Sequence, residues 1–115
     1  MGAPVPDACG SLHGTAARYG LVSYKPTFGL IPNDGAHLSS WSIDQVGCLA
    51  LTVEDAALLL DVLDPAPHMR YSQALFKALR GVHIGLPLAL LERAEAGAAA
   101  AVRAAAAAMR RAGAE

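Results

Sequence analysis

A serine in a turn of small residues is the feature of this sequence that could do chemistry. Ser11 follows the stretch "DACG", residues 7–10, and precedes an alanine-containing run that predicts a short helix. Two roles are open for its hydroxyl: it could be a nucleophile, or it could be the N-cap of the helix that follows. A nucleophilic serine needs a base, because a free hydroxyl reacts poorly at pH 7.

The titratable side chains near this serine are Asp7 and His13. Residues two apart on a helix do not face each other, so His13 is expected to point away from Ser11. A local Ser–His–Asp triad is therefore not expected. Cys9 and His13, four residues apart, could share a helix face, but two ligands are too few for a zinc site. We expect no bound metal here.

The composition limits the classes of partner. The 115 residues suffice for one domain, and 54% of them are hydrophobic while only 17% are charged. This excess of apolar residues predicts self-association or aggregation of the isolated chain through unpaired apolar surface. The net charge of −1 gives no electrostatic reason to expect nucleic acid or an anionic membrane as a partner.

The expected location is the cytoplasm. The first ten residues lack the basic and apolar regions of a signal peptide, and the alanine tract 98–108 is too short and too weakly apolar to span a bilayer. The two cysteines, Cys9 and Cys48, make no disulfide framework, so free thiols are expected, as is usual in the cytoplasm.

Capping and periodicity predict the elements around the serine. Residues 46–51 predict a buried strand, and residues 53–63 predict a helix with a wide leucine face. Thr52 is the expected N-cap of this helix, with an acidic residue three positions on, as in a capping box. Pro65 and Pro67 predict its end and a linker.

The second half of the chain predicts two more helices and a strand. A short amphipathic helix is expected over residues 71–80, and a buried strand over residues 82–86. The longest helix is expected over about residues 94–112, because alanine is the best helix former, with Gly113 as its C′ residue. This order of strands and helices indicates an α/β fold.

Three runs of the sequence match the patterns of one family. The run "DACGSLHGTAARYGLVSYKPTFGLIP" resembles T-D-T-G-G-S-[IV]-R-x-P-A followed by C-G-[VL]-x-G-L-K-P-T-x-G. The run "SSWSIDQVGCLALTVEDAALLLDVL" resembles S-L-D-x-[IV]-G-P-[LM]-A-R-[ST]-V-E-D-A-A-L-L-L. The runs "ALRGVHIGLPLALLE" and "AAAVRAAAAAMRRAGAE" resemble L-K-G-L-R-I-G-V-P and a helix that ends in G-A-E. From about residue 7 to residue 115, the chain is similar to the amidase signature family.

The resemblance implies a partial amidase signature fold, with a mixed sheet and flanking helices that are incomplete in this chain. It implies one partial amidase-like domain over residues 1–115, which lacks the N-terminal and C-terminal parts of the family's domain. The family hydrolyses small linear amides, or serves as amidotransferase subunits, through a Ser–cis-Ser–Lys triad without a cofactor. Ser11 would be the nucleophile, and the oxyanion hole would consist of the backbone N–H groups of Ala8, Cys9, Gly10 and Ser11.

The sequence also departs from the family's pattern. Cys9 stands at a glycine position, which would cost about 1 kcal/mol or more if its φ were positive. His13 replaces the usual arginine, and Thr15 replaces the usual proline. The family's lysine and cis-serine precede the nucleophile, in a region that this chain lacks. Lys25 belongs to the K-P-T run and Lys77 to a predicted helix, so neither is expected in the triad.

Two functional hypotheses follow. In the first, the chain is part of an amidase that, when complete, converts a carboxamide to an acid plus ammonia or an amine through an acyl-serine. The chain alone is then expected to be inactive, because it lacks the base. In the second, the chain is a non-catalytic remnant that acts as a small self-associating or binding module.

Overall fold

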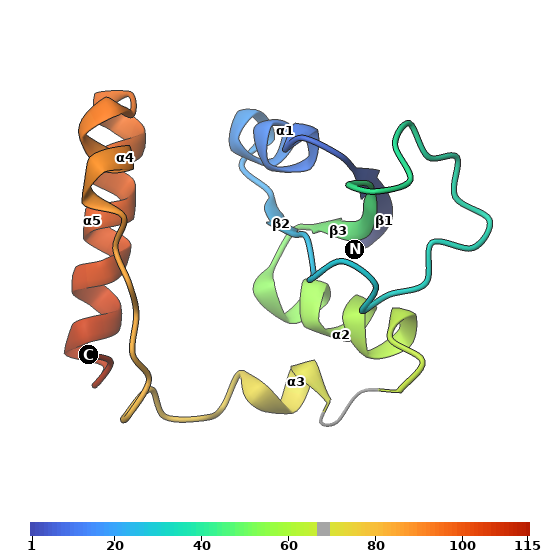
Figure 1. The fold of residues 1–115 in the computed structure, drawn as a ribbon. Coiled ribbons are helices and arrows are strands. Elements are labelled where there is room, and N and C mark those ends of the chain that lie inside the picture. The colour runs from blue at the N-terminus through green and yellow to red at the C-terminus, as the bar shows by residue number, and fades with distance from the viewer. Residues whose placement is uncertain (67–69) are drawn as a thin grey trace. The chain divides into compact units, whose positions relative to one another are not determined.

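The computed structural model describes residues 1–66 and 70–115 (Figure 1). They form two compact units, Met1–Leu75 and Phe76–Glu115, which are described separately below. Pro67, the second proline of the predicted linker, lies outside the described residues. The combination of a small sheet with flanking helices confirms the predicted α/β class.

The first unit contains a three-stranded sheet with the strand order β1-β3-β2. The strands are β1 (Gly2–Asp7), β2 (Val22–Tyr24) and β3 (Gln45–Ala50), and both outer strands pair antiparallel with β3. The central strand confirms the strand predicted over residues 46–51. Because β1 and β2 run in the same direction on either side of β3, their C-terminal ends lie at the same end of the sheet.

β1 forms from a segment that carries no strand signal of its own. It contains Pro4 and Pro6, which cannot donate a backbone hydrogen bond. An edge strand tolerates such residues, because one of its sides needs no hydrogen-bonding partner. β1 occupies that edge position, with Asp7 at its end opposite Gln45.

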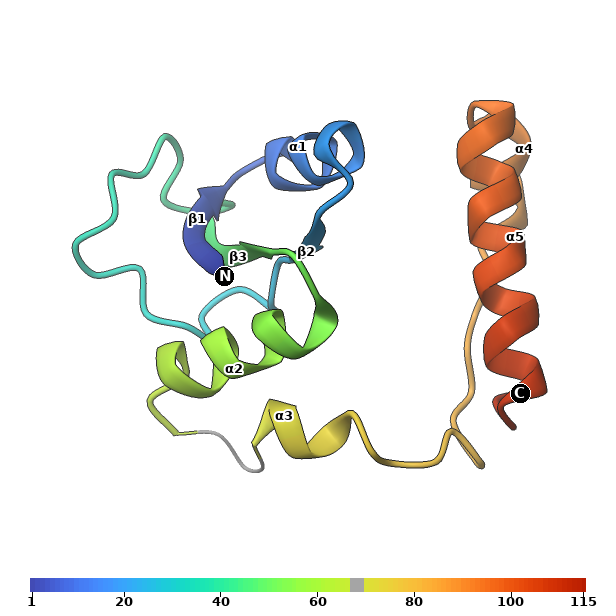
Figure 2. The same ribbon diagram turned by 180° about the vertical axis from the view of Figure 1, so that it is seen from behind.

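Two helices lie on opposite sides of the sheet, α1 (Ser11–Tyr19) and α2 (Val53–Leu63) (Figures 1 and 2). The side chains of β3 alternate between the two sides, as strand geometry requires. Cys48 and Ala50 belong to the buried cluster with Ile31 and with Ala56 and Leu60 of α2. Gly47 faces the other side, where an added Cβ would contact Leu12 of α1 and overlap the backbone carbonyl of Tyr24.

α2 has the boundaries that its capping residue predicts. The Oγ1 of Thr52 accepts a hydrogen bond from the Asp55 N–H at 3.1 Å, and the helix ends one residue before Asp64, its C-cap. Pro65 follows directly, which explains why the helix does not continue. The prediction of a helix over residues 53–63 is confirmed.

The predicted helix over residues 71–80 is wrong in length. Only α3 (Tyr71–Ala74) forms, and none of its residues is buried. Its start is fixed by Asp61, whose carboxylate accepts hydrogen bonds from the Tyr71 N–H and the Ser72 hydroxyl at 2.5 Å each. A helix of so few turns depends on packing, and Leu75, which would begin its apolar face, is 37% exposed.

The second unit contains α4 (Leu88–Arg93) and α5 (Ala96–Arg111). α5 confirms the long helix predicted over about residues 94–112, and Gly113 follows its C-cap with a φ of 101°, as expected of a C′ glycine. α4 was not predicted separately. None of the described helices is long and apolar enough to cross a membrane.

The strand predicted over residues 82–86 is wrong. This segment has no strand or helix assignment. The Ile84 N–H donates to the Glu115 carbonyl at 2.6 Å, and the Glu115 N–H donates to the Val82 carbonyl at 2.9 Å. These two bonds have the parallel-sheet pattern, but only one residue takes part on the opposite side, so no ladder forms.

Candidate active site

The turn between β1 and α1 presents Ser11 at the start of a helix. Gly10 is the N-cap residue, with a φ of 96° and a ψ of 13°, and its side-chain-free backbone fits this left-handed conformation. Ser11 is the first residue of α1, and its side chain is exposed. The hypothesis that Ser11 is the N-cap of this helix is therefore wrong.

Cys9 does not adopt the conformation that would penalise it. No described residue other than glycine has a positive φ, so the turn places its one left-handed residue at Gly10. The condition for a backbone cost at Cys9 is therefore not met. The Cys9 thiol is free and exposed, and the Cys48 thiol is free and buried, as expected of unpaired cysteines.

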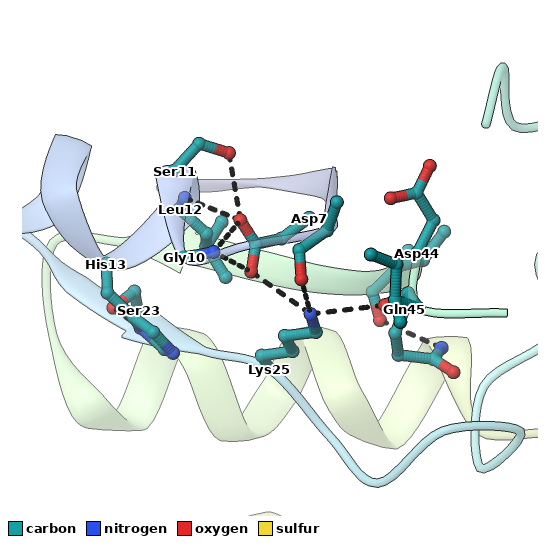
Figure 3. Close-up of polar contacts among 12 residues, drawn as sticks. Asp7, Gly10, Ser11, Leu12, His13, Ser23, Lys25, Asp44 and Gln45 are labelled. Atoms are coloured by element: carbon teal, nitrogen blue, oxygen red, sulfur yellow. Dashed lines mark hydrogen bonds and ion pairs between the residues drawn. The ribbon is translucent and has the colours of Figure 1, made fainter. Parts of the chain in front are cut away.

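Asp7 takes over the capping of α1. Its Oδ1 accepts hydrogen bonds from the N–H groups of Gly10 and Leu12, each at 3.0 Å. The same oxygen accepts a hydrogen bond from the Ser11 hydroxyl at 2.8 Å (Figure 3). The Asp7 side chain therefore satisfies two N–H groups at the start of the helix, which belong to residues three and five positions after it.

The charge of Asp7 is stabilised in spite of its burial. Burial alone would raise the pKa of Asp7, but the hydrogen bonds from Leu12, Ser11, Lys25 and Gly10 outweigh it and lower the pKa to about 2. At neutral pH the group is a carboxylate and a poor proton acceptor. Asp7 therefore holds the Ser11 hydroxyl as a hydrogen-bond acceptor and is unsuited to act as its general base.

His13 lies away from the serine, as predicted. Its Nδ1 is 2.7 Å from the Ser23 Oγ of β2, and both groups lie apart from the Ser11 hydroxyl (Figure 3). No Ser–His–Asp arrangement forms among Ser11, His13 and Asp7. Among the described residues, no group of three or more His, Cys, Asp or Glu side chains could hold a metal ion.

Lys25 is the residue that sequence reasoning missed. Its Nζ lies 3.3 Å from Asp7 Oδ2 and donates hydrogen bonds to the carbonyls of Ala8, at 2.7 Å, and Ile43, at 3.3 Å. Figure 3 shows this ammonium group between the turn and the segment that leads into β3. The sequence signal was the K-P-T run, but only the pairing of β1 and β2 with the same strand brings it beside the turn.

Gln45 holds the loop that follows Lys25. The side chain of Gln45 is fully buried, its Oε1 accepts from the Gly29 N–H at 2.7 Å, and its Nε2 donates to the Ile31 carbonyl at 2.9 Å. Gln45 is also the residue opposite Asp7 in the sheet. The turn after β1, Lys25 and the loop that follows it therefore lie at the same end of the sheet.

The comparisons with known proteins agree with the sequence patterns. A family model described as Amidase matches residues 6–115 of this chain. The chain belongs to the amidase signature family. No solved structure matches it.

The relatives that this chain resembles include three proteins named as the A subunit of a glutamyl-tRNA(Gln) amidotransferase. The protein of Thermosynechococcus vestitus is 42% identical over 90 residues, which are 70% of this chain and 19% of the relative. The protein of Hahella chejuensis is 43% identical over 91 residues, also 70% of this chain and 19% of the relative. That of Natronomonas pharaonis is 36% identical over 103 residues, 79% of this chain and 24% of the relative. The chain spans about a fifth of the length of these relatives.

Proposed function

We propose that this chain is the nucleophile-bearing part of an amidase that converts a carboxamide to a carboxylic acid and ammonia or an amine. The observation that carries the proposal is the placement of Ser11. Its exposed hydroxyl stands at the N-terminus of α1, directly after a turn with a left-handed glycine. A helix N-terminus adds positive potential where an oxyanion would develop.

The proposed reaction proceeds through an acyl-serine. The Oγ of Ser11 bonds to the amide carbonyl carbon while a base removes the hydroxyl proton, which gives a tetrahedral oxyanion. The C–N bond then breaks, and the nitrogen takes up a proton as it leaves as ammonia or an amine. Water attacks the remaining ester, which releases the acid and restores the hydroxyl.

The proposed oxyanion donors are the backbone N–H groups of Ala8, Cys9, Gly10 and Ser11. In the structure, the Gly10 N–H donates to the Asp7 carboxylate. Among the described residues, the N–H groups of Cys9 and Ser11 do not donate to the Asp7 carboxylate. In this conformation, the Gly10 N–H is therefore committed to Asp7, whereas the N–H groups of Cys9 and Ser11 are not.

The base is proposed to come from residues outside this chain. A positioned base contributes about 10²–10⁴-fold to such a reaction. Asp7 is a poor proton acceptor, because its pKa is lowered to about 2. The His13 ring nitrogen is bonded to Ser23, and Lys25 points at carbonyl oxygens and at Asp7. The proposal therefore assigns no base among these three residues.

The test is to incubate the isolated chain with a fluorophosphonate probe and with simple carboxamides, beside its Ser11→Ala variant. We expect no ammonia release and no labelling above the level of the variant. Ammonia release that disappears in Ser11→Ala would show that a residue of this chain acts as base, with His13→Ala as the next variant to test. Labelling that survives Ser11→Ala but falls in Cys9→Ser would identify the thiol as the reactive group.

A non-catalytic binding module is the second candidate, favoured by the apolar surface. Among the described residues, four large apolar ones are more than four-fifths exposed, namely Met1, Trp41, Val62 and Phe76. Such surface favours self-association of the isolated chain. A monomer by light scattering, over the concentrations used for the labelling, would remove the support for this candidate.

A further inference from the structure

The two oxygens of the Asp7 carboxylate make different contacts. Oδ1 accepts from the Leu12 N–H and the Ser11 hydroxyl, whereas Oδ2 lies 3.3 Å from the Lys25 Nζ. The Gly10 N–H is shared between the two oxygens at 3.0 Å each. The carboxylate therefore links the start of α1 to the lysine that follows β2.

In this ion pair, the Asp7 carboxylate is buried and the Lys25 side chain is partly exposed to solvent. The Asp7 side chain has an exposed fraction of 0%, and that of Lys25 has 23%. Among the described residues, Lys25 is the charged group that contacts Asp7. His13 of α1 is directed to Ser23, and the carboxylate of Asp44, beside β3, accepts from the N–H groups of Ser39 and Ser40.

Lys25 also fixes the direction of a backbone N–H. Its Nζ donates to the Ala8 carbonyl at 2.7 Å. No cis peptide bond is present among the described residues, and in a trans peptide the carbonyl and the next N–H point in opposite directions. The Cys9 N–H must therefore point away from Lys25, which contacts the carbonyl side of the same peptide.

The hydroxyl of Ser11 has one proton, and that proton is committed to Asp7. A serine hydroxyl donates one hydrogen bond at a time, so it cannot donate to Asp7 and to a general base together. The conformation in the structure is therefore a resting orientation of the nucleophile. For attack, the hydroxyl must turn from Asp7 Oδ1 toward the base.

Resting on the proposed amidase function, we propose that Asp7 and Lys25 are positioning residues of the nucleophile. Asp7 holds the Ser11 hydroxyl in the resting orientation, and Lys25 holds both the carboxylate and the Ala8–Cys9 peptide, so that the Cys9 N–H is presented for an oxyanion. Neither residue exchanges a proton with the substrate.

The experiment follows Asp7, Cys9 and Ser11 of the full chain by NMR between pH 6 and the lowest pH at which circular dichroism shows the fold intact. We expect the Asp7 carboxyl, the Cys9 amide and the Ser11 Cβ signals to change with one shared midpoint near the acid limit. In Lys25→Met we expect that midpoint to move to higher pH by about one, because an adjacent opposite charge lowers a carboxyl pKa. Lys25→Arg is expected to restore it, and Lys77→Met, at an exposed lysine of the other unit, to leave it unchanged.

An unchanged midpoint in a folded Lys25→Met variant would overturn the proposal. It would mean that the Lys25 charge does not act on Asp7 and that the side chain only fills space. If Lys25→Met does not fold, the wild-type spectra decide: Ser11 or Cys9 signals that do not follow Asp7 would overturn the proposal. These readouts need no catalysis. The NMR result can therefore contradict the positioning roles of Asp7 and Lys25 without contradicting the proposed amidase function. Equally, it can support these roles if the amidase function is contradicted.

Discussion

At the residue scale, the presentation of Ser11 depends on the backbone of one glycine. Gly10 has a left-handed φ of 96°, and an added Cβ there would contact nothing within 4 Å. Any cost of a side chain at this position therefore comes from the backbone conformation. Gly14, within α1, also has open space around its Cβ direction but lacks a positive φ, which makes it a matched control.

We predict that Gly10→Ala destabilises the fold by about 1–2 kcal/mol, since an alanine in the left-handed region is strained. Gly14→Ala should stabilise it by about 0.5–1 kcal/mol, because alanine is the better helix residue. Urea unfolding of both variants measures the two effects. Equal stabilities in both variants would contradict the assigned conformation of the turn.

The residues of the site were predictable to different degrees. Ser11 and its turn could be found from a local motif, because the spacing of small residues is preserved even with Cys9 in place of glycine. The contact of Lys25 with Asp7 could not, because it joins residues 18 apart through the order of the strands. The capping by Asp7 was likewise hidden, since the expected cap was the serine itself.

At the element scale, local signals decided which predictions were right. α2 has its cap, its leucine face and a terminating proline in one continuous run, so its boundaries were predicted correctly. β1 and α3 depend on contacts elsewhere: β1 on its pairing with β3, and α3 on the Asp61 carboxylate. The segment 82–86 has a strand-like sequence, but a strand also needs a partner of several residues.

The cap of α2 gives the prediction at this scale. Thr52→Ala should lower the free energy of unfolding by about 1 kcal/mol, because the Asp55 N–H loses its acceptor. Thr52→Ser keeps the hydroxyl and should stay close to the wild type. Thermal unfolding followed by circular dichroism compares the three proteins, and a loss in Thr52→Ser as large as in Thr52→Ala would assign the effect to packing instead of capping.

At the scale of the whole molecule, the chain matches an amidase family over nearly all its length but spans about a fifth of its named relatives. The proposed chemistry is divided accordingly. In the proposal, this chain contributes the nucleophile, the turn and the Asp7–Lys25 pair, and the base comes from other residues. If this division is right, Ser11 should act as the nucleophile when this chain is combined with the rest of a related protein.

The decisive measurement is ammonia release from simple carboxamides by a chimera. In it, this chain replaces the segment to which it aligns in the Thermosynechococcus vestitus relative, and the unaltered relative is assayed under the same conditions for comparison. We predict release by the chimera that falls to background in Ser11→Ala and persists in Ser23→Ala. A folded chimera that is inactive with Ser11 in place, or equally active after the Ser11→Ala substitution, would contradict the assignment of Ser11 as the nucleophile.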